Sequence, residues 1–362
     1  MAKDRYLVLE NGMVFKGSAF GADGDVTAEL VFTTAMTGYL EALTDKSYTG
    51  QALMMTFPLI GNYGVIPEDS ESDGNGPCAF IVREWCDEPS NFRCGTDLDK
   101  YLAERGIVGL YGIDTRALVR ILRENGTMNA KITSVPSKVS LEAIKSYSIK
   151  APLAVCSTKE KRTVGAADSP YSVALLDFGV KTNIVRSLVK RGAKVTVLPA
   201  LTSPEEIAAL APDGVLLSNG PGDPADDYNT AIIENIRRLM AMKYPTLGIC
   251  LGHQLYALAN GFTTEKLKYG HRGANHPVRD TRTGRVYISS QNHGYAVTPS
   301  SVSQGTASVL FENVNDKTNE GLLYRTTPAL TVQFHPEACA GPHDTEFLFD
   351  DFFDLMKQLK KG

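Results

Sequence analysis

The chain has 362 residues, of which 43% are hydrophobic and 22% charged, a composition typical of a soluble globular protein of about two domains. Its formal net charge of −4 provides no basic field for nucleic acid or anionic lipid. The sequence shows neither a signal peptide nor an apolar run of the ~20 residues that a membrane span needs. We therefore expect a cytoplasmic protein with no nucleic-acid and no membrane partner.

The N-terminal part, residues 1–156, contains several short extended runs. The first two, RYLVLE and MVFKGSAF, flank Asn11-Gly12, which is a strong hairpin signal. Asp114 as N-cap and Gly126 just past the last turn delimit a predicted helix. This part is predicted to be a strand-rich α+β domain. Its other predicted strands are residues 29–36, 51–57, 78–85 and 107–113, and its other predicted helix is 97–106.

The pattern changes after residues 157–170, which are polar, small and poorly periodic and predict a linker. From residue 171 to 362, short apolar runs alternate with amphipathic ones, which predicts an α/β domain with a mostly parallel sheet and helices on both faces. In such a sheet, functional sites form beyond the carboxyl ends of the strands. The predicted strands are 172–178, 193–200, 213–219 and 244–249, and the predicted helices are 181–192, 203–210, 227–242 and 251–260.

Cys250 lies where the predicted strand 244–249 meets the predicted helix 251–260, in the stretch GICLGHQ. G-x-C-x-G has the form of a sharp strand-to-helix turn that exposes a nucleophile. Gly248 and Gly252 remove side chains where strand and helix cross closely. The helix N-terminus favours a thiolate and stabilises an oxyanion. The alternative is a small buried residue at a tight turn.

His335 and Glu337 are the best candidates for the base and the residue that orients it. An apolar strand, 330–334, ends at His335. If the extended geometry continues, His335 and Glu337 face the same way, and the carboxylate can hold the imidazole in the tautomer that accepts the thiol proton. His253 is predicted to be structural, because a side chain at such a turn points away from its own helix.

The remaining histidines and the cysteines give no metal-binding pattern. His293 has no partner carboxylate in its motif, which favours a local structural or substrate-side role. His271, His276 and His343 lie in Gly/Pro-rich loops and are interpreted as loop anchors. The six cysteines form no C-x-x-C pair and have no histidine among the closely spaced ones, so no metal site is expected.

The stretch LSNGPGDP, residues 217–224, predicts a strand end followed by a turn with exposed backbone N–H groups. Gly220 or Gly222 can then supply a second oxyanion donor beside the N–H group of Leu251. An ordinary turn is the alternative.

Together, GICLGHQ, HPE and NGPGDP resemble a class I, triad-type glutamine amidotransferase. Longer stretches narrow the resemblance to the small chain of glutamine-hydrolysing carbamoyl-phosphate synthase, from about residue 5 to 358, and the N-terminal ones are not shared by other amidotransferases. These stretches are 32–51, 57–64, 112–126, 177–188, 270–278, 290–297 and 335–344.

The resemblance implies a catalytic triad of Cys250, His335 and Glu337 that acts through a glutamyl thioester. It places the site near the domain interface, because Ser47 comes from the N-terminal domain. Tyr295 stands where the family often has phenylalanine, and Cys339 where serine is common. The residues that the resemblance implies for binding L-glutamine are Ser47, Gly220, Gly222, Leu251, Gln254, Asn292, Gly294 and Tyr295.

The resemblance also implies a partner. This chain lacks the pattern G-x-x-x-x-G-K-[ST], and its nearest run, 178–182, lacks the first glycine and the spacing. The family supplies a large ATP-dependent synthetase chain, which receives ammonia and makes carbamoyl phosphate for arginine and pyrimidine biosynthesis. We expect the N-terminal domain to dock on that chain in a heterodimer, with higher oligomers of the heterodimer left open. No cofactor is expected in this chain, whereas ATP, Mg²⁺ (or K⁺) and bicarbonate are expected on the partner.

Three other functions remain as alternatives. The first is an amidotransferase that feeds anthranilate or guanylate synthesis, which the N-terminal motifs disfavour. The second is a cysteine peptidase, although the papain-type C-G-[SA]-C-[WY] is absent. The third is a non-catalytic scaffold on an amidotransferase fold, which would be expected to lack one of the three triad residues.

Overall fold

The computed structural model describes residues 3–74 and 76–360. The chain divides into two compact units, Met1–Lys150 and Ala151–Gly362. The predicted linker, 157–170, therefore lies inside the second unit, where its residues 162–164 pair antiparallel with a strand of the large sheet. All three residues of this edge strand are exposed, so no apolar periodicity marks it in the sequence. Residues 151–156, which were predicted to belong to the N-terminal domain, also belong to the second unit, and Leu153 is part of one of its apolar cores.

The first unit is a closed barrel with the strand order β1-β2-β8-β6-β4-β3-β9. The predicted hairpin at Asn11-Gly12 is present as β1 and β2, and Gly12 has the positive φ of 89° that the turn needs. Strand β9 was not predicted, although it closes the barrel by pairing with β1 and β3. The strands are β1 (Asp4–Leu9), β2 (Val14–Gly21), β3 (Val26–Thr33), β4 (Gln51–Met55), β5 (Leu59–Ile60), β6 (Ala79–Ile81), β7 (Glu84–Trp85), β8 (Val108–Tyr111) and β9 (Met128–Thr133).

Helix α3 covers the interior of the barrel. Its predicted boundaries are confirmed: the Asp114 side chain accepts a hydrogen bond from the Ala117 N–H group at 3.0 Å, and Gly126 ends the helix with φ 98°. Leu118 and Leu122 pack in one core with residues of the barrel strands. The helices of this unit are α1 (Tyr39–Thr44), α2 (Leu98–Glu104), α3 (Thr115–Asn125) and α4 (Leu141–Lys145).

The second unit is built on one ten-stranded sheet with the order β10-β12-β11-β13-β14-β19-β18-β17-β15-β16. The predicted parallel pairing is present in β12, β11, β13, β14 and β19. Strand β10 pairs antiparallel with β12, and β19, β18, β17, β15 and β16 pair antiparallel in turn, so the sheet as a whole is mixed rather than mostly parallel. The strands are β10 (Arg162–Val164), β11 (Tyr171–Asp177), β12 (Ala193–Pro199), β13 (Gly214–Leu217), β14 (Thr246–Ile249), β15 (Thr264–Asp280), β16 (Val286–Val297), β17 (Ala307–Asn313), β18 (Asn319–Tyr324) and β19 (Ala329–Val332).

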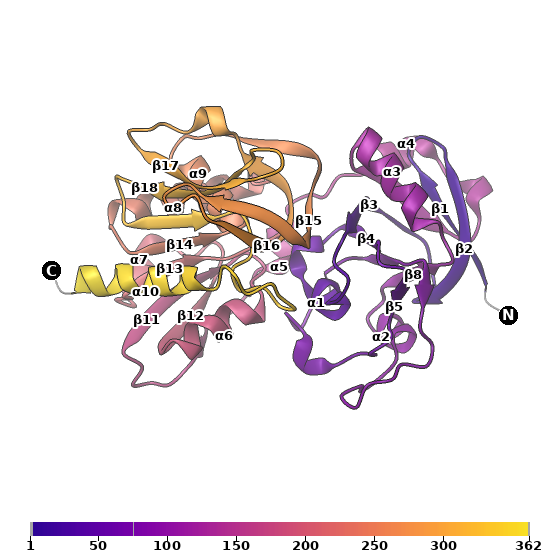
Figure 1. Cartoon of the computed structure of the whole chain (residues 1–362), viewed down its shortest axis with the longest axis horizontal. Coiled ribbons are helices and arrows are strands. Elements are labelled where there is room, and N and C mark those ends of the chain that lie inside the picture. The colour runs from indigo at the N-terminus through magenta and orange to yellow at the C-terminus, as the bar shows by residue number, and fades with distance from the viewer. Residues whose placement is uncertain (1–2, 75, 361–362) are drawn as a thin grey trace. The chain divides into compact units, whose positions relative to one another are not determined.

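Helices cover both faces of this sheet, as the alternating sequence pattern predicts (Figure 1). Apolar side chains of α6 and α10 form one core with the sheet, and those of α7, α8 and α9 form a second core. Burial on both sides explains why the parallel strands are continuous apolar runs. The helices are α5 (Leu153–Cys156), α6 (Thr182–Lys190), α7 (Pro204–Ala208), α8 (Thr230–Ala241), α9 (Leu251–Ala259) and α10 (Phe347–Lys360).

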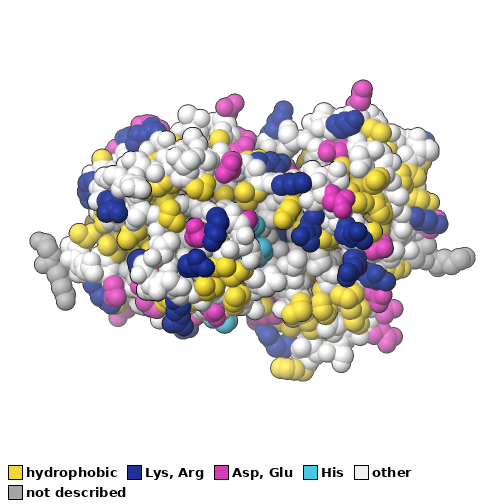
Figure 2. Space-filling view, turned by 45° about the horizontal axis from the view of Figure 1, so that its top comes forward, with side chains coloured by type: hydrophobic (Ala, Val, Ile, Leu, Met, Phe, Trp, Pro, Cys, Tyr) yellow, Lys and Arg dark blue, Asp and Glu magenta, His cyan; other side chains and the backbone are white. Residues whose placement is uncertain are grey.

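The surface carries charges of both signs. On the face shown in Figure 2, Lys and Arg side chains are interspersed with Asp, Glu and hydrophobic side chains, which agrees with the small net charge of −4. Within the described residues, no helix combines the length and the apolar character needed to cross a membrane.

The close crossing of α9 over β13 leads to a first prediction. A Cβ atom on Gly252 would overlap the carbonyl oxygen of Leu217, a backbone atom that cannot rotate away. We expect Gly252→Ala to lower the free energy of unfolding by about 1–3 kcal/mol or more, measured by urea denaturation. The matched control is Gly305→Ala, where the nearest atom to the new methyl group is 3.8 Å away. Equal stability of the two variants would contradict this account of the crossing.

Candidate active site

Cys250 occupies the predicted sharp turn between β14 and α9. Its backbone has φ 53° and ψ −105°, a strained conformation for a residue other than glycine. A Cβ atom on Gly248 would lie 2.8 Å from Thr331 Cγ2, so both flanking glycines are required by close packing. The first N–H groups of α9 have no intrahelical acceptor and lie beside the cysteine. This is the geometry of a nucleophile at a strand-to-helix turn.

The Cys250 sulfur has contacts with β16 and with the segment after β19. The backbone carbonyl of Asn292 lies 3.7 Å from Sγ, and the side-chain amide of Gln333 donates to Sγ at 3.6 Å. Gln254, one turn into α9, fixes Gln333, because its amide donates to Gln333 Oε1 at 2.8 Å and to the Tyr295 carbonyl at 2.7 Å. The turn is therefore tied to both β16 and the segment after β19.

His335 and Glu337 face the same way, as predicted from the strand end. The distance between His335 Nδ1 and Glu337 Oε1 is 2.6 Å, and both side chains are buried. The backbone N–H group of His335 donates to the backbone carbonyl of Ser290 at 2.9 Å, and this bond attaches the segment to β16. With Nδ1 directed at the carboxylate, Nε2 is left as the imidazole nitrogen available for proton transfer.

Lys181 completes a buried row of charges. Its Nζ lies 3.5 Å from Glu337 Oε1. The loop that carries it is folded by Asp177, whose Oδ1 accepts hydrogen bonds from the N–H groups of Gly179 and Val180 at 2.8 Å each. The carboxylate of Glu337 thus lies between an ammonium group and an imidazole.

The electrostatics of this row favour an ionised pair. Burial and the charge of Lys181 oppose protonation of His335, but the Glu337 carboxylate and the Cys250 thiol outweigh them and raise the pKa of His335 to about 9. Burial disfavours the charged form of Glu337, yet His335 and Lys181 hold the pKa of Glu337 below its usual value. The imidazole is therefore a strong base that the carboxylate stabilises when it is protonated.

The glycine-rich loop after β13 lies against the start of α9. A Cβ atom on Gly220 would lie 2.8 Å from Leu251 Cδ2, and the backbone N–H group of Gly252 donates to the Ser218 carbonyl at 3.0 Å, so the two segments are packed together. Gly222 has φ 91°, which only glycine adopts readily. The structure thus brings together the segments that supply the two predicted oxyanion donors.

The other residues that the resemblance implies for glutamine binding lie in two places. Asn292, Gly294 and Tyr295 are on β16, and Asn292 contacts the cysteine sulfur as described. Ser47 belongs to the first unit, where its N–H group donates to Asp45 Oδ1 at 2.9 Å. The assignment of these residues to glutamine stays a prediction.

Sequence reasoning missed two residues of the site. Lys181 was considered only as part of a failed phosphate-binding pattern, and Gln333 was hidden inside an apolar strand. A polar residue within a buried run was the available signal for Gln333, which is fully buried. A lysine in the short loop between a buried strand and the following helix was the signal for Lys181.

The histidines outside the site are structural or differ from the prediction. His253 is fully buried and its Nδ1 lies 2.7 Å from Thr331 Oγ1, and burial lowers its pKa to about 3, so the predicted structural role is supported. The interpretation of His271 and His276 as loop anchors is wrong, because both lie on β15. Gly270 and Gly273 lie at the register shifts of the β15–β16 pairing, whereas Pro277 pairs in register with Ile288.

Comparison with known proteins defines first the class and then the family. Residues 174–355 match the family described as class-I glutamine amidotransferase, which covers the whole constellation around Cys250. Residues 7–132 match the carbamoyl-phosphate synthase small chain, CPSase domain. These two matches follow the division of the chain into two units.

Full-length relatives give the same family. The carbamoyl phosphate synthase small chain of Syntrophotalea carbinolica is 49% identical over 374 residues, which cover 98% of each chain. That of Chlorobaculum tepidum is 47% identical over 363 residues, again with 98% of each chain covered. The chain belongs to the carbamoyl phosphate synthase small chain family and has its glutamine-hydrolysing amidotransferase role. As a small chain, it has a large-chain partner.

The His335–Glu337 pair predicts a pH-dependent stability. The folded-state pKa of His335, about 9, exceeds its ordinary value of 6.5, so its contribution to the free energy of unfolding is fully present below pH 6.5 and is lost as the pH rises through 9. Glu337→Gln removes the charge that raises this pKa. We expect the variant to lose on the order of 1–3 kcal/mol more stability at about pH 6 than at about pH 9.5, measured by urea unfolding.

The control for this comparison is Glu142→Gln, because Glu142 is exposed on a helix of the first unit. Its small effect should be the same at both pH values. If the loss of stability caused by Glu337→Gln is also the same at both pH values, His335 and Glu337 do not form the charged pair described.

Proposed function

We propose that Cys250, His335 and Glu337 form the catalytic triad with which this chain hydrolyses glutamine to glutamate and ammonia. The observation that carries the proposal is the strained cysteine at the N-terminus of α9, in one buried site with a carboxylate-held imidazole. The family membership supplies the substrate, because amidotransferases of this class act on the glutamine side-chain amide.

The residues divide the chemistry as follows. In the reactive form the proton of Cys250 resides on His335 as a thiolate–imidazolium pair, which the basic imidazole favours, and the thiolate attacks the amide carbon of glutamine. The N–H groups of Leu251 and of Gly220 or Gly222 hold the oxyanion, and each such donor is typically worth about 10²–10³ in rate. His335 then gives its proton to the departing ammonia. Water, activated by His335, hydrolyses the glutamyl thioester.

The surrounding residues hold these groups in place. Lys181 keeps Glu337 ionised, and Glu337 fixes the tautomer of His335. Gln254 and Gln333 hold the cysteine turn against β16, whose residues Asn292, Gly294 and Tyr295 are proposed to contact glutamine. Ser47 is the proposed contribution of the first unit to the same ligand.

The ammonia is proposed to pass to the large synthetase chain, which uses ATP, Mg²⁺ (or K⁺) and bicarbonate to make carbamoyl phosphate for arginine and pyrimidine biosynthesis. The first unit is proposed to dock on that chain in the cytoplasm. Two observations support this division of labour: the CPSase domain match covers the barrel, and the class-I amidotransferase match covers the other unit.

Glutamate release tests the nucleophile. We expect Cys250→Ser to abolish glutamine hydrolysis, both alone and with the large chain, because triad residues act as a unit. The complex with this variant should still make carbamoyl phosphate from added ammonia. Cys86→Ser is the matched control, since Cys86 is a free thiol of the first unit, and it should keep wild-type activity. Wild-type glutaminase activity in Cys250→Ser would rule out the assignment.

The base is tested separately. His335→Asn keeps a polar group of similar size but removes the titratable nitrogen, and we expect glutamine hydrolysis to fall by about 10²–10⁴. Glutamine binding, measured by equilibrium dialysis, should change much less. His253→Asn is the control, because His253 is buried away from the proposed proton transfer. A larger loss of turnover in His253→Asn than in His335→Asn would mean that the base has been misassigned.

A further inference from the structure

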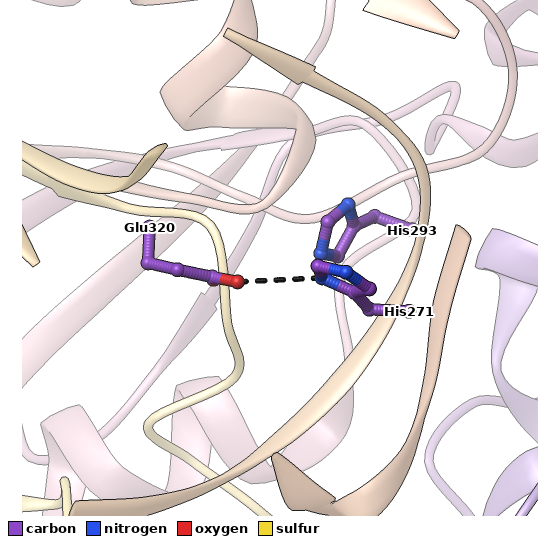
Figure 3. Close-up of side chains that lie close together, drawn as sticks. All are labelled: His271, His293 and Glu320. Carbon is purple, nitrogen blue, oxygen red and sulfur yellow. Dashed lines mark ion pairs between the residues drawn. The ribbon is translucent and has the colours of Figure 1, made fainter. Parts of the chain in front are cut away.

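A second group of buried titratable side chains lies outside the proposed triad. His271 on β15, His293 on β16 and Glu320 on β18 point toward one another (Figure 3). One potential ligand atom from each lies within 4.8 Å of the others. His271 and His293 are direct cross-strand partners, and all three side chains are buried. Because the three residues lie far apart in the sequence, no short sequence motif contains them.

Each of the three side chains is oriented by a partner behind it. His271 Nε2 lies 2.7 Å from Asp316 Oδ2, so its N–H group donates outward and Nδ1 faces Glu320 Oε1 at 3.3 Å. His293 Nδ1 lies 2.8 Å from the Tyr295 carbonyl, and the Asn313 amide donates to Glu320 Oε1 at 2.9 Å. Carboxylate and carbonyl partners of this kind fix the tautomer and orientation of metal-binding histidines.

The inward-facing atoms are poorly satisfied by the protein itself. His271 Nδ1 and Glu320 Oε2 are buried and make no hydrogen bond to any described residue. The two ring nitrogens of His293 face oxygen acceptors, Tyr295 O and Gln291 Oε1, the latter at 3.1 Å. Burial and the neighbouring His271 lower the pKa of His293 well below its usual value. A neutral imidazole has one N–H group, so it can donate to only one of these two oxygens. The lone pair of its other nitrogen then faces an oxygen acceptor and has no donor.

The geometry points to a metal site: we propose that His271, His293 and Glu320 bind one divalent ion of the zinc type. Two imidazoles and a carboxylate are a recurrent zinc ligand set, whereas Mg²⁺ and Ca²⁺ prefer oxygen ligands alone. Ligand atoms about 2.1 Å from a tetrahedral zinc are about 3.4 Å apart, which the 3.3 Å between His271 Nδ1 and Glu320 Oε1 already matches. Glu320 Oε2, which makes no hydrogen bond to any described residue, can also bind the ion.

The competing occupant is a proton on His271 Nδ1. Asp316 and Glu320 flank the ring and favour that proton. A histidine nitrogen must be deprotonated to bind Zn²⁺, so the ion displaces the proton, which goes to solvent. The affinity should accordingly rise with pH.

Such an ion would be structural, because its ligands are buried and come from three strands. It would join β15, β16 and β18 at the segment of β16 that carries Asn292, whose carbonyl contacts the Cys250 sulfur. The proposal rests on this cluster alone and does not depend on the proposed triad.

The test uses the full-length chain with Cys250→Ser, which removes a competing thiol ligand. After chelator treatment, Zn²⁺ and Co²⁺ are titrated in by calorimetry and by visible absorption. We expect one ion per chain, the visible bands of four-coordinate Co²⁺, release of about one proton below pH 8, and a higher melting temperature in Zn²⁺.

Glu320→Gln and His293→Gln, in the same background, should each weaken binding at least tenfold and lose the Zn²⁺-dependent rise in melting temperature. The matched control is His276→Gln, because the His276 ring lies 5.2 Å from that of His271 but is not one of the three ligands. It should bind the ion as the parent does. Absence of stoichiometric binding by the parent chain, or equal binding by parent and Glu320→Gln, would overturn the proposal and leave His271 protonated between its carboxylates.

Discussion

The close crossing of α9 over β13 and β14 is the constraint on which the site depends. Gly248 and Gly252 allow backbone to meet backbone there, and Cys250 between them takes a strained conformation that points its side chain out of the turn. Since β13, β14 and β19 are parallel neighbours, their carboxyl ends meet at one edge of the sheet. The glycine-rich loop, the cysteine and the His335 segment come together for that reason.

Burial sets the chemistry of the groups gathered there. In water, a lysine, a carboxylate and an imidazole at these distances would interact weakly, but inside the protein each depends on its neighbours to remain charged. Lys181 and His335 stabilise the ionised Glu337, and Glu337 in turn makes the imidazole more basic. The same reasoning applies at His271, where two carboxylates surround a buried ring.

Much of the fold and the centre of the site could be predicted from the sequence, because strong local signals mark them. The Asn11-Gly12 hairpin, the caps of α3 and the turn at Cys250 each follow from a few neighbouring residues. The exposed strand β10 gave no comparable pattern, because all of its side chains face solvent. Strand β9, MNAKIT, does alternate apolar and polar residues, a signal that was present in the sequence but short. Lys181, Gln333 and the His271 group were missed because only the folded sheet brings them to their partners.

Closure of the barrel by β9 has a consequence for how the first unit can meet another protein. In a closed ring every strand has a neighbour on both sides, so no strand of the ring is an edge strand. A partner cannot extend this barrel by adding a strand of its own. Recognition by the barrel itself must then use side chains, loops and the small helices around it, where a fit between two shapes, rather than backbone pairing, decides which chain is accepted.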